Sequence, residues 1–281
     1  MQIKKIGILF HPMLETTRLK AVELTAFLEA QNVESWTCSA WDKDRATEYL
    51  NNTDLIITTG GDGTILRAAH VVYKQAIPIT GVNMGTLGFL TEIKADEAIG
   101  QIKRILAGEG WLDERSMLEA QLFNPEGEPY LPDPLIALND VVLARGAVAK
   151  LIQIAASVDE KPLTNYRADG IILATATGST GYALSAGGPI VYPHSENFLL
   201  VPIVPHLTLG YSLVLSSEST VKLQLRTSTQ ATLSIDGHIN IPVVDKTVFR
   251  IRRSKFKNRF LRLRPAEYFF TELEEKLRGK K

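Results

Sequence analysis

DLIITTGGDGT, residues 54–64, is the stretch that decides the fold. Its first half is a short apolar run typical of a buried strand, and the residues after GGDGT have helical spacing from about Thr64 to Tyr73. A strand that passes through a glycine-rich turn into a helix is typical of a βα unit in an open α/β sheet. Ligands bind such sheets at the carboxyl ends of the strands, so this turn is a candidate functional site.

The residue types of the turn, residues 60–64, suit phosphate chemistry. Glycines let backbone N–H groups approach an oxyanion, and a helix N-terminus adds partial positive charge. The carboxylate of Asp62 would repel a polyphosphate unless it binds a cation or accepts a proton from an attacking hydroxyl. The turn matches neither the P-loop pattern nor the dinucleotide fingerprint. The structural alternative is a tight turn in which Asp62 caps the helix.

The alternation of strand and helix extends over about the first 110 residues. Further strands are expected at residues 4–10 and 79–83, and further helices at residues 16–31 and 95–107. The helix at 16–31 has Thr16 and Thr17 as candidate N-caps, and its apolar positions include Leu19 and Val22. This pattern predicts an open parallel α/β domain, which we place at residues 1–115.

After about Ser116 the helical pattern stops. Short runs rich in Val, Ile, Leu and Thr follow one another and predict an all-β, sandwich-like domain at residues 116–264. Within it, the basic run 246–264 is expected to form a strand hairpin with its arginines on one solvated face. The last segment, residues 265–281, is expected to contain a helix that returns to the first domain.

A second glycine-rich element, TATGSTGYALSAGGP, occupies residues 175–189. Its small hydroxylated residues offer many hydrogen-bond donors and a close approach to the backbone, which suits a ribose and phosphate surface. Tyr182 adds a flat apolar face with a polar tip. A flexible loop is the alternative interpretation.

Composition narrows the possible classes of protein. The chain has 281 residues, 45% of them hydrophobic and 22% charged, which argues against a largely disordered chain. Formal net charge is zero, and no apolar run is long enough to span a bilayer, so neither nucleic acid nor a membrane is an expected partner. The single cysteine, Cys38, is expected to be a buried small hydrophobe and favours a cytoplasmic location. No His/Cys cluster indicates a structural zinc.

Taken together, these motifs resemble those of the NAD kinase family. The family pattern runs GGDGT, N-x-G-x-LGF, Asn plus an acidic residue, DG, T-P-T-G-S-T-A-Y, S-x-G-G-P-I, a PH pair and DGQ. The corresponding stretches here are residues 60–64, 83–90, 139–140, 169–170, 175–182, 185–190, 205–206 and 236–238, in that order. GGDGT alone is shared with diacylglycerol, sphingoid-base and phosphofructo-kinases, whereas the ordered set is far more specific.

The resemblance implies ATP-dependent phosphorylation of the 2′-hydroxyl of the adenosine ribose of NAD, giving NADP. A divalent cation, Mg²⁺ in the simplest case, would arrive with ATP. Asp62 would be the proton acceptor, and Gly61, Gly63 and Thr64 would bind phosphate. The residues implied to bind NAD are Asp62, Gly63, Arg67, Phe89, Asn139, Asp140, Lys150, Arg167, Asp169, Thr180, Gly181, Tyr182, Ala183, Leu184, Ser185 and His238.

The resemblance also implies more specific roles for some of these residues. Arg67 would lie near phosphate, and Asn139 and Asp140 would hold ribose hydroxyls. Asp169 would lie near the nicotinamide amide, and residues 180–185 would line the adenine and ribose pocket. Family members are dimers or tetramers, so a homodimer or homotetramer is expected, in which Arg167 could reach a neighbouring subunit's site.

The chain departs from the family pattern at four places. Ala176 replaces a proline, Gly181 replaces an alanine, and Asp140 is one methylene shorter than the Glu often found. The segment after His206 reads LTLGYSLV and lacks the usual Arg-Pro. These departures concern affinity and pocket shape more than the type of reaction.

Two alternative functions remain open from the sequence. One is a lipid or sphingoid-base kinase that shares GGDGT, although residues 175–189 are polar where a lipid site needs an apolar slot. The other is a non-catalytic NAD(P)-binding sensor. The only observation that suggests it is the substitution of the family residues by Ala176 and Gly181 in the second glycine-rich element.

Overall fold

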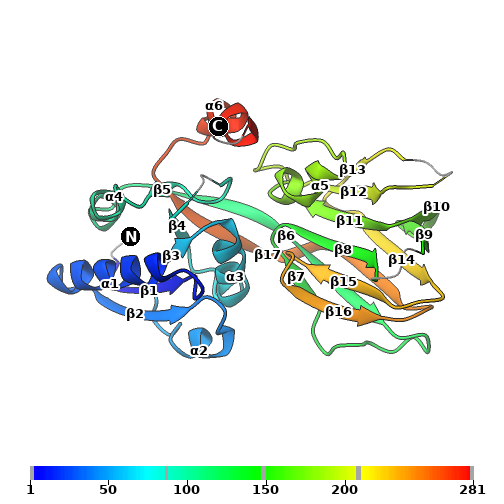
Figure 1. The fold of residues 1–281 in the computed structure, drawn as a ribbon, viewed down its shortest axis with the longest axis horizontal. Coiled ribbons are helices and arrows are strands. Elements are labelled where there is room, and N and C mark those ends of the chain that lie inside the picture. The colour runs from blue at the N-terminus through cyan, green and yellow to red at the C-terminus, as the bar shows by residue number, and fades with distance from the viewer. Residues whose placement is uncertain (1–2, 86–87, 147–149, 207–209, 279–281) are drawn as a thin grey trace. The chain divides into compact units, whose positions relative to one another are not determined.

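The computed structural model describes residues 3–85, 88–146, 150–206 and 210–278. The chain forms two compact units (Figure 1). The first unit is Met1–Glu114 together with Asn258–Lys281, and the second is Arg115–Lys257. The long strands β6 (Trp111–Phe123) and β17 (Val248–Arg262) each carry the chain from one unit to the other.

The first unit is an α/β unit built on a parallel sheet. Its strands are ordered β17-β4-β3-β1-β2, and β5 also pairs with β4. The bounds are β1 (Lys5–Phe10), α1 (Glu15–Ala30), β2 (Glu34–Ser39), α2 (Lys43–Glu48), β3 (Leu55–Gly60), α3 (Asp62–Val72), β4 (Ile79–Asn83), β5 (Ile93–Lys94), α4 (Ala98–Leu106) and α6 (Tyr268–Arg278). The predicted βα alternation is confirmed, and the strand predicted at 79–83 is β4.

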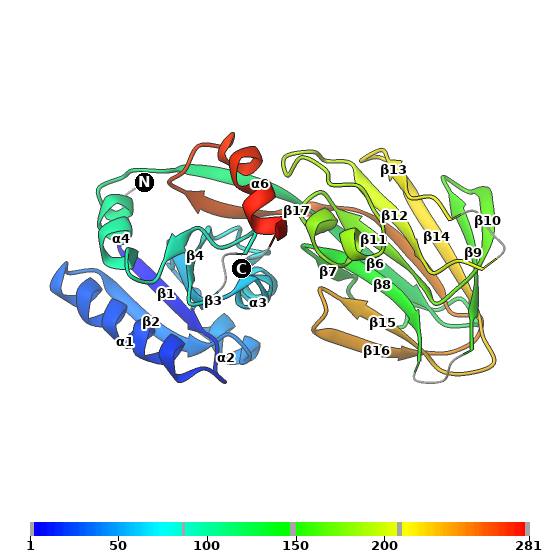
Figure 2. The ribbon, with the colours of Figure 1, turned by 45° about the horizontal axis from the view of Figure 1, so that its top comes forward.

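Helices lie on both faces of this sheet. Residues of α1 and α4, such as Leu24 and Ile102, share one apolar core with Ile8 and Ile57 of the strands. Helix α3 packs on the opposite face, where Gly81 of β4 leaves room for the side chain of Ile65. Figure 2 shows α1 running along β1 and β2.

Helix α1 differs from the prediction at its start and on its surface. Its N-cap is Leu14, and neither Thr16 nor Thr17 caps it, because both lie inside the helix. The hydroxyl of Thr17 donates instead to the backbone carbonyls of His11 and Leu14. Leu19 and Val22 are 56% and 57% exposed, so the buried face of the helix is narrower than the apolar pattern predicts.

The second unit is all-β, as predicted, and consists of two layers. One layer has the order β10-β9-β14-β17, with β6 paired to β17 and β7, and the other has the order β13-β12-β11-β8-β15-β16. The bounds are β7 (Leu135–Ala137), β8 (Asp140–Arg145), β9 (Ile152–Val158), β10 (Lys161–Ala168), β11 (Gly170–Thr175), β12 (Phe198–Ile203), β13 (Leu213–Leu215), β14 (Thr220–Arg226), β15 (Ala231–Ile235) and β16 (Ile239–Val243). Two short helices, η1 (Gly178–Thr180) and α5 (Tyr182–Ser185), follow β11.

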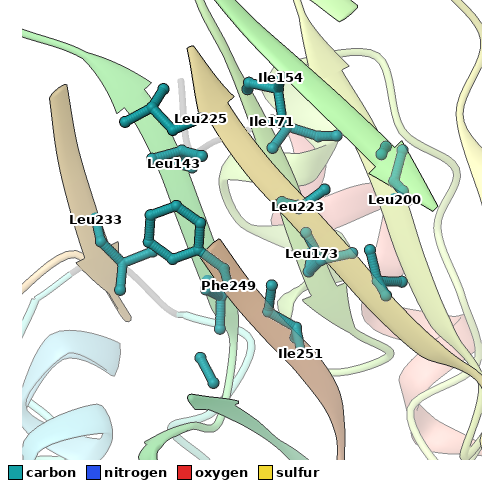
Figure 3. Packing of buried hydrophobic residues seen from close by; sticks show 14 of the residues in the cluster. Leu143, Ile154, Ile171, Leu173, Leu200, Leu223, Leu225, Leu233, Phe249 and Ile251 are labelled. Atoms are coloured by element: carbon teal, nitrogen blue, oxygen red, sulfur yellow. The ribbon is translucent and has the colours of Figure 1, made fainter. Parts of the chain in front are cut away.

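The core of the second unit lies between these layers. Alternate residues of β14, such as Leu223 and Leu225, point inward and meet Leu143, Leu173 and Leu233 of the other sheet (Figure 3). Strands with this period-two burial pattern form a sandwich because each sheet has one apolar face. The predicted sandwich-like architecture is therefore present.

The basic run forms one continuous strand and not the predicted hairpin. Residues 248–262 are all part of β17. Many of its cations form ion pairs: Arg252 with Glu119, Arg253 with Glu196 and Glu218, Lys257 with Glu196, Arg259 with Glu114, and Arg262 with Asp113. The run is therefore not a single solvated face, since each acid is contributed by another part of the chain.

The sequence predicts that Cys38 is buried, and the structure confirms this prediction. Cys38 is buried, 4% exposed, and this burial raises the pKa of its thiol. Among the described residues, none of the helices has both the length and the apolar character that crossing a bilayer would require.

Candidate functional site

The GGDGT turn joins β3 to α3 at the carboxyl end of the sheet strands. Gly60 ends β3 and cannot be replaced without movement, because an added Cβ would overlap the side chain of Thr64. Gly61 is the helix N-cap, and a Cβ at Gly61 or Gly63 would meet no atom within 4 Å. The turn therefore presents open, exposed backbone at two glycines.

Thr64 is placed differently from these two glycines. It is 1% exposed, its N–H donates to the carbonyl of Gly61 at 3.0 Å, and its hydroxyl is buried without a hydrogen-bond partner. Of the three positions expected to bind phosphate, Gly61 and Gly63 are open to solvent, whereas Thr64 faces the interior.

The carboxylate of Asp62 does not cap its helix. It accepts backbone N–H bonds from the loop at residues 88–91: Phe89 donates to Oδ2 at 2.7 Å, and Leu90 and Thr91 both donate to Oδ1 at 3.1 Å. A carboxylate has about four acceptor positions, so these bonds leave roughly one on Oδ2. Asp62 is half-buried, and the structural alternative in which it serves as an N-cap is wrong.

The 88–91 loop fits Asp62 closely. A Cβ added at Gly88 would overlap both carboxylate oxygens of Asp62, so only glycine allows this approach. Phe89 is half-buried, with the ammonium of Lys276 5.6 Å from its ring centroid. Two residues of the family-like motif, Thr86 and Leu87, lie outside the described residues.

Arg67 lies on α3 and packs against an aromatic side chain. Its guanidinium sits over the ring of Trp41, 4.0 Å from the centroid, and burial lowers its pKa. The ring of His11 meets the same tryptophan edge-on at 4.4 Å. The expected place of Arg67 near phosphate stays a prediction, since the contact found here is a cation–π contact.

In the second unit, a second carboxylate is held by three backbone N–H groups. Asp236, with a φ of 49° and 6% exposure, accepts bonds from Leu138 at 2.8 Å, Asn139 at 2.7 Å and Asp140 at 3.0 Å. Its own N–H donates to the carbonyl of Asp140 at 3.0 Å. Asp236 thereby fixes the turn between β7 and β8, which carries the expected ribose-binding pair.

The two side chains of that pair have unusual environments. Asp140 is 6% exposed, and its burial, together with the negative charge of Asp236, raises its pKa to about 7. A carboxyl group with this pKa can donate or accept a hydrogen bond near neutral pH. The side-chain oxygen of Asn139 is buried without a hydrogen-bond partner.

A pocket of about 330 Å³ opens beside this pair. It is lined by Asn139, Asp140, Val142, Tyr182, Ser234, Asp236 and Gly237. Tyr182 is 48% exposed and contributes the aromatic surface that the sequence indicates for this element. The structure thus brings Tyr182 to the neighbouring pair Asn139 and Asp140, from which it is distant in the sequence.

The second glycine-rich element is folded against the same turn. The hydroxyl of Thr175 donates to the carbonyl of Leu138 at 2.6 Å, and its N–H donates to that of Asn139 at 2.8 Å. A Cβ at Gly178 would overlap the backbone of Asn139, and one at Gly181 would lie 3.3 Å from the carbonyl of Gly178. The alternative of a flexible loop is therefore wrong, because residues 175–189 form η1 and α5 and are hydrogen-bonded to the core.

The remaining expected residues occupy varied positions. Ala183 is fully buried in an apolar cluster, Leu184 and Thr180 are half-buried, and Ser185, Lys150 and Arg167 are exposed. Asp169 forms an ion pair with Arg145 at 2.6 Å, and the Nδ1 atom of His238 lies 3.1 Å from the carbonyl of Asp236. Of the segment 207–214, residues 207–209 lie outside the described residues.

Sequence reasoning missed two residues that shape these two places and one that pairs with an expected site residue. They are Gly88 against Asp62, Asp236 under Asn139 and Asp140, and Arg145 paired with Asp169. Asp236 was visible only as the first letter of the DGH motif, and its partners lie 96 to 98 positions earlier in the chain. No local signal reveals contacts over that separation.

Comparison with known proteins gives consistent matches. The model of the ATP-NAD kinase N-terminal domain matches residues 7–110, and that of the ATP-NAD kinase C-terminal domain matches residues 138–263. An NAD kinase of Dehalococcoides mccartyi (strain CBDB1) is 49% identical over 98% of this chain and 96% of its own length. An NAD kinase of Chloroflexus aggregans is 38% identical over 98% of this chain and 99% of its own length.

Two solved structures resemble the chain along nearly its whole length. Yeast NADH kinase complexed with NADH has a TM-score of 0.83 and 26% identity, covering 99% of this chain and 88% of that chain. An NAD kinase from Archaeoglobus fulgidus in complex with ATP has a TM-score of 0.78 and 29% identity, covering 98% of both chains.

Proposed function

The chain belongs to the NAD kinase family, and from that premise we propose that it transfers the γ-phosphoryl group of ATP to the 2′-hydroxyl of the adenosine ribose of NAD, giving NADP. NAD kinase activity itself follows from the family match, which extends over nearly the full length of named NAD kinases. The proposal adds the hydroxyl that reacts, the group that takes its proton and the cation that accompanies ATP.

The observation that carries the proposal is the placement of Asp62. Asp62 lies at the centre of the glycine-rich turn, and three backbone N–H groups fix its carboxylate, with about one acceptor position left. In the reaction, the 2′-oxygen bonds to the γ-phosphorus, the bond to the β–γ bridging oxygen breaks and ADP leaves. The hydroxyl proton passes to Asp62.

Positioning is expected to contribute more than basicity at this carboxylate. An ordinary carboxylate is too weak a base to ionise an alcohol before the attack, so Asp62 orients the hydroxyl and takes the proton late. Phosphoryl transfer depends mainly on alignment and on neutralising phosphate charge. General-base assistance of this kind contributes about 10²–10⁴-fold.

The residues present fit a divalent cation that enters on the nucleotide. Mg²⁺ prefers phosphate oxygens and waters to an all-protein cage. In the described part of the chain, His, Cys, Asp and Glu side chains form no group of three or more that could hold a metal ion, and most acceptor positions of Asp62 are taken by N–H groups. When bound with ATP, the cation would neutralise charge on the phosphates.

For the dinucleotide, we propose a binding role for the pocket of the second unit. Its half-buried amide, its carboxyl group and its tyrosine ring, from Asn139, Asp140 and Tyr182, match a ribose and an adenine in chemistry. The roles expected for Lys150, Arg167, Asp169 and His238 toward NAD remain predictions. So do a cytoplasmic location and a homodimer or homotetramer.

The experiment that tests the proposal follows NADP directly. The full chain is incubated with NAD, ATP and Mg²⁺. NADP is then detected with a dehydrogenase that uses NADP but not NAD as its cofactor. We expect NADP to form, and to stop forming when EDTA removes the cation. NAD-dependent thermal stabilisation without any phosphorylated product would contradict the proposal and favour a sensor. Phosphorylation of a sphingoid base in place of NAD would favour a lipid kinase.

A further inference from the structure

A group of buried charges lies in the first unit beside the loop that holds Asp62. Its members are Glu92, Asp113 and Arg262, which are 9%, 2% and 9% exposed. The Nε atom of Arg262 donates to Asp113 at 3.2 Å, and its Nη1 atom lies 3.6 Å from a carboxylate oxygen of Glu92. The guanidinium also sits 4.4 Å from the ring centroid of Phe260.

This group is joined to the Asp62 loop through one residue. The Nη1 atom of Arg262 donates to the carbonyl of Leu90 at 2.7 Å, and the N–H of the same Leu90 donates to Asp62 at 3.1 Å. Leu90 thus links the buried guanidinium, through its carbonyl, to the proposed proton acceptor, through its N–H.

Glu92, which follows the 88–91 loop, connects that end of the loop to the residues that directly follow β17, the strand of Arg262. Its Oε1 atom accepts the N–H groups of Leu263 and Arg264 at 2.9 and 2.6 Å. Its own N–H donates to Gly81 of β4 at 3.2 Å. Glu92 therefore fixes the loop between β4 and the end of β17. It does so at the position that follows Thr91, the last residue whose N–H holds Asp62.

Stability alone gives a weak reason for burying these ions. Taking each ion out of water costs several kcal/mol, and apolar replacements of similar volume often leave a protein as stable or more so. A guanidinium with two buried carboxylates, by contrast, has a fixed orientation, because its planar donors accept few arrangements. Such a group suits the task of holding one carbonyl in one place.

We propose that Arg262, oriented by Asp113 and Glu92, is a positioning residue for the phosphoryl transfer: it fixes the 88–91 loop and thereby the carboxylate of Asp62. The inference rests on the proposed role of Asp62 as proton acceptor. In this role Arg262 acts through the carbonyl of Leu90 and not through a contact of its own with the carboxylate.

The test compares Arg262→Gln and Arg262→Lys with a control on the same strand. Arg259→Gln is the control, since Arg259 forms a partly exposed ion pair with Glu114 at 3.0 Å. We expect Arg262→Gln to lower kcat about 10²-fold at an unchanged KM for NAD, because a misplaced reacting group costs that much. Arg262→Lys, which keeps a charged donor, should recover part of the loss, and Arg259→Gln should have wild-type kcat.

A double variant separates positioning from general destabilisation. If Arg262 acts through Asp62, Arg262→Gln lowers the residual rate of Asp62→Asn far less than it lowers the wild-type rate. Equal fold losses in both backgrounds, or wild-type kcat in Arg262→Gln, would overturn the inference. If Arg262→Gln does not fold, Glu92→Gln, which keeps the Oε1 acceptor, is measured in the same way with the same expected pattern.

Wild-type NADP formation is measured in the same series. If the wild-type chain forms no NADP, the proposed function is contradicted. If it forms NADP but Arg262→Gln lowers the rate by the same factor with and without Asp62→Asn, only the role of Arg262 is contradicted.

Discussion

Two carboxylates of this chain are held in the same way but sit in different surroundings. Asp62 in the first unit and Asp236 in the second each accept three backbone N–H bonds from consecutive residues. Asp62 is half-buried beside exposed glycines, whereas Asp236 is 6% exposed beneath a turn. The same arrangement can therefore present a carboxylate to a ligand or use it to fix the backbone.

The neighbours of the two carboxylates explain the difference. Asp236 lies beside a second buried acid, Asp140, whose pKa it helps to raise to about 7. Asp62 lies between two exposed glycines, Gly61 and Gly63, and its carboxylate is held by the 88–91 loop. We infer that Asp62 takes part in the reaction. Asp236, by contrast, maintains the shape of the pocket that Asn139 and Asp140 line.

The sharpest test of this contrast is Asp62→Asn, for which the largest effect is expected. Removal of the proposed proton acceptor should lower kcat by about 10²–10⁴-fold. The dissociation constant for NAD and the free energy of unfolding should change little, because an amide oxygen still accepts two of the three bonds. Initial rates measure kcat, calorimetric titration measures NAD binding, and urea unfolding measures stability. A kcat near the wild-type value would contradict the role of Asp62 as proton acceptor.

Asp236→Asn should show the opposite pattern. The amide oxygen can keep the bonds from Asn139 and Asp140, but the NH₂ group then faces the N–H of Leu138. That N–H is left unsatisfied in a buried site, which lowers the free energy of unfolding by about 2 kcal/mol. The KM for NAD should rise because the turn at Asn139 and Asp140 loses its support, while kcat at saturating NAD should fall far less than in Asp62→Asn. Urea unfolding and steady-state kinetics measure both, and unchanged stability would remove the distinction between the two carboxylates.

Gly88→Ala tests the loop side of the Asp62 contact. An added Cβ overlaps the carboxylate, so Asp62 must move, and kcat should fall about 10²-fold. Gly100→Ala is the matched control, because a Cβ at this position of α4 meets no atom within 4 Å. The control should keep wild-type kcat and gain slightly in stability. Equal rates in the two variants would show that the loop does not constrain Asp62.

The smallest expected effect is a pH dependence at Asp140. Its pKa is about 7 in the folded chain and about 4 in an unfolded one, so the folded state holds the proton more tightly. Its contribution to stability is therefore greatest at low pH and is lost as pH rises from about 4 to about 7. Asp140→Asn should gain stability relative to wild type over that window, on the order of 2 kcal/mol. Urea unfolding at pH 5 and pH 7.5 measures the difference, and a constant difference would contradict the raised pKa.

The sequence predicted the features that depend on local patterns. The strand, glycine turn and helix around residues 54–73, the strand at 79–83 and the all-β character after Ser116 follow from periodicity and turn residues over short windows. Asn139, Asp140 and Tyr182 were selected by family resemblance, and the structure brings them to one pocket.

The features that were missed depend on distant contacts. Whether residues 246–264 bend into a hairpin or continue as β17 is decided by partner strands, not by alternation within the run. Leu19 and Val22 have the right spacing for a buried face, yet the sheet covers only part of α1. Gly88 is 26 residues from Asp62, and no short-range pattern indicates that they touch.

A structure of the chain with NAD and a non-hydrolysable ATP analogue tests the role of Asp62 most directly. We expect the 2′-oxygen of the adenosine ribose within about 3.2 Å of Asp62 Oδ2, with the bonds from Phe89, Leu90 and Thr91 retained. A complex with both ligands ordered, in which another hydroxyl or no hydroxyl lies within hydrogen-bond reach of that carboxylate, would contradict it.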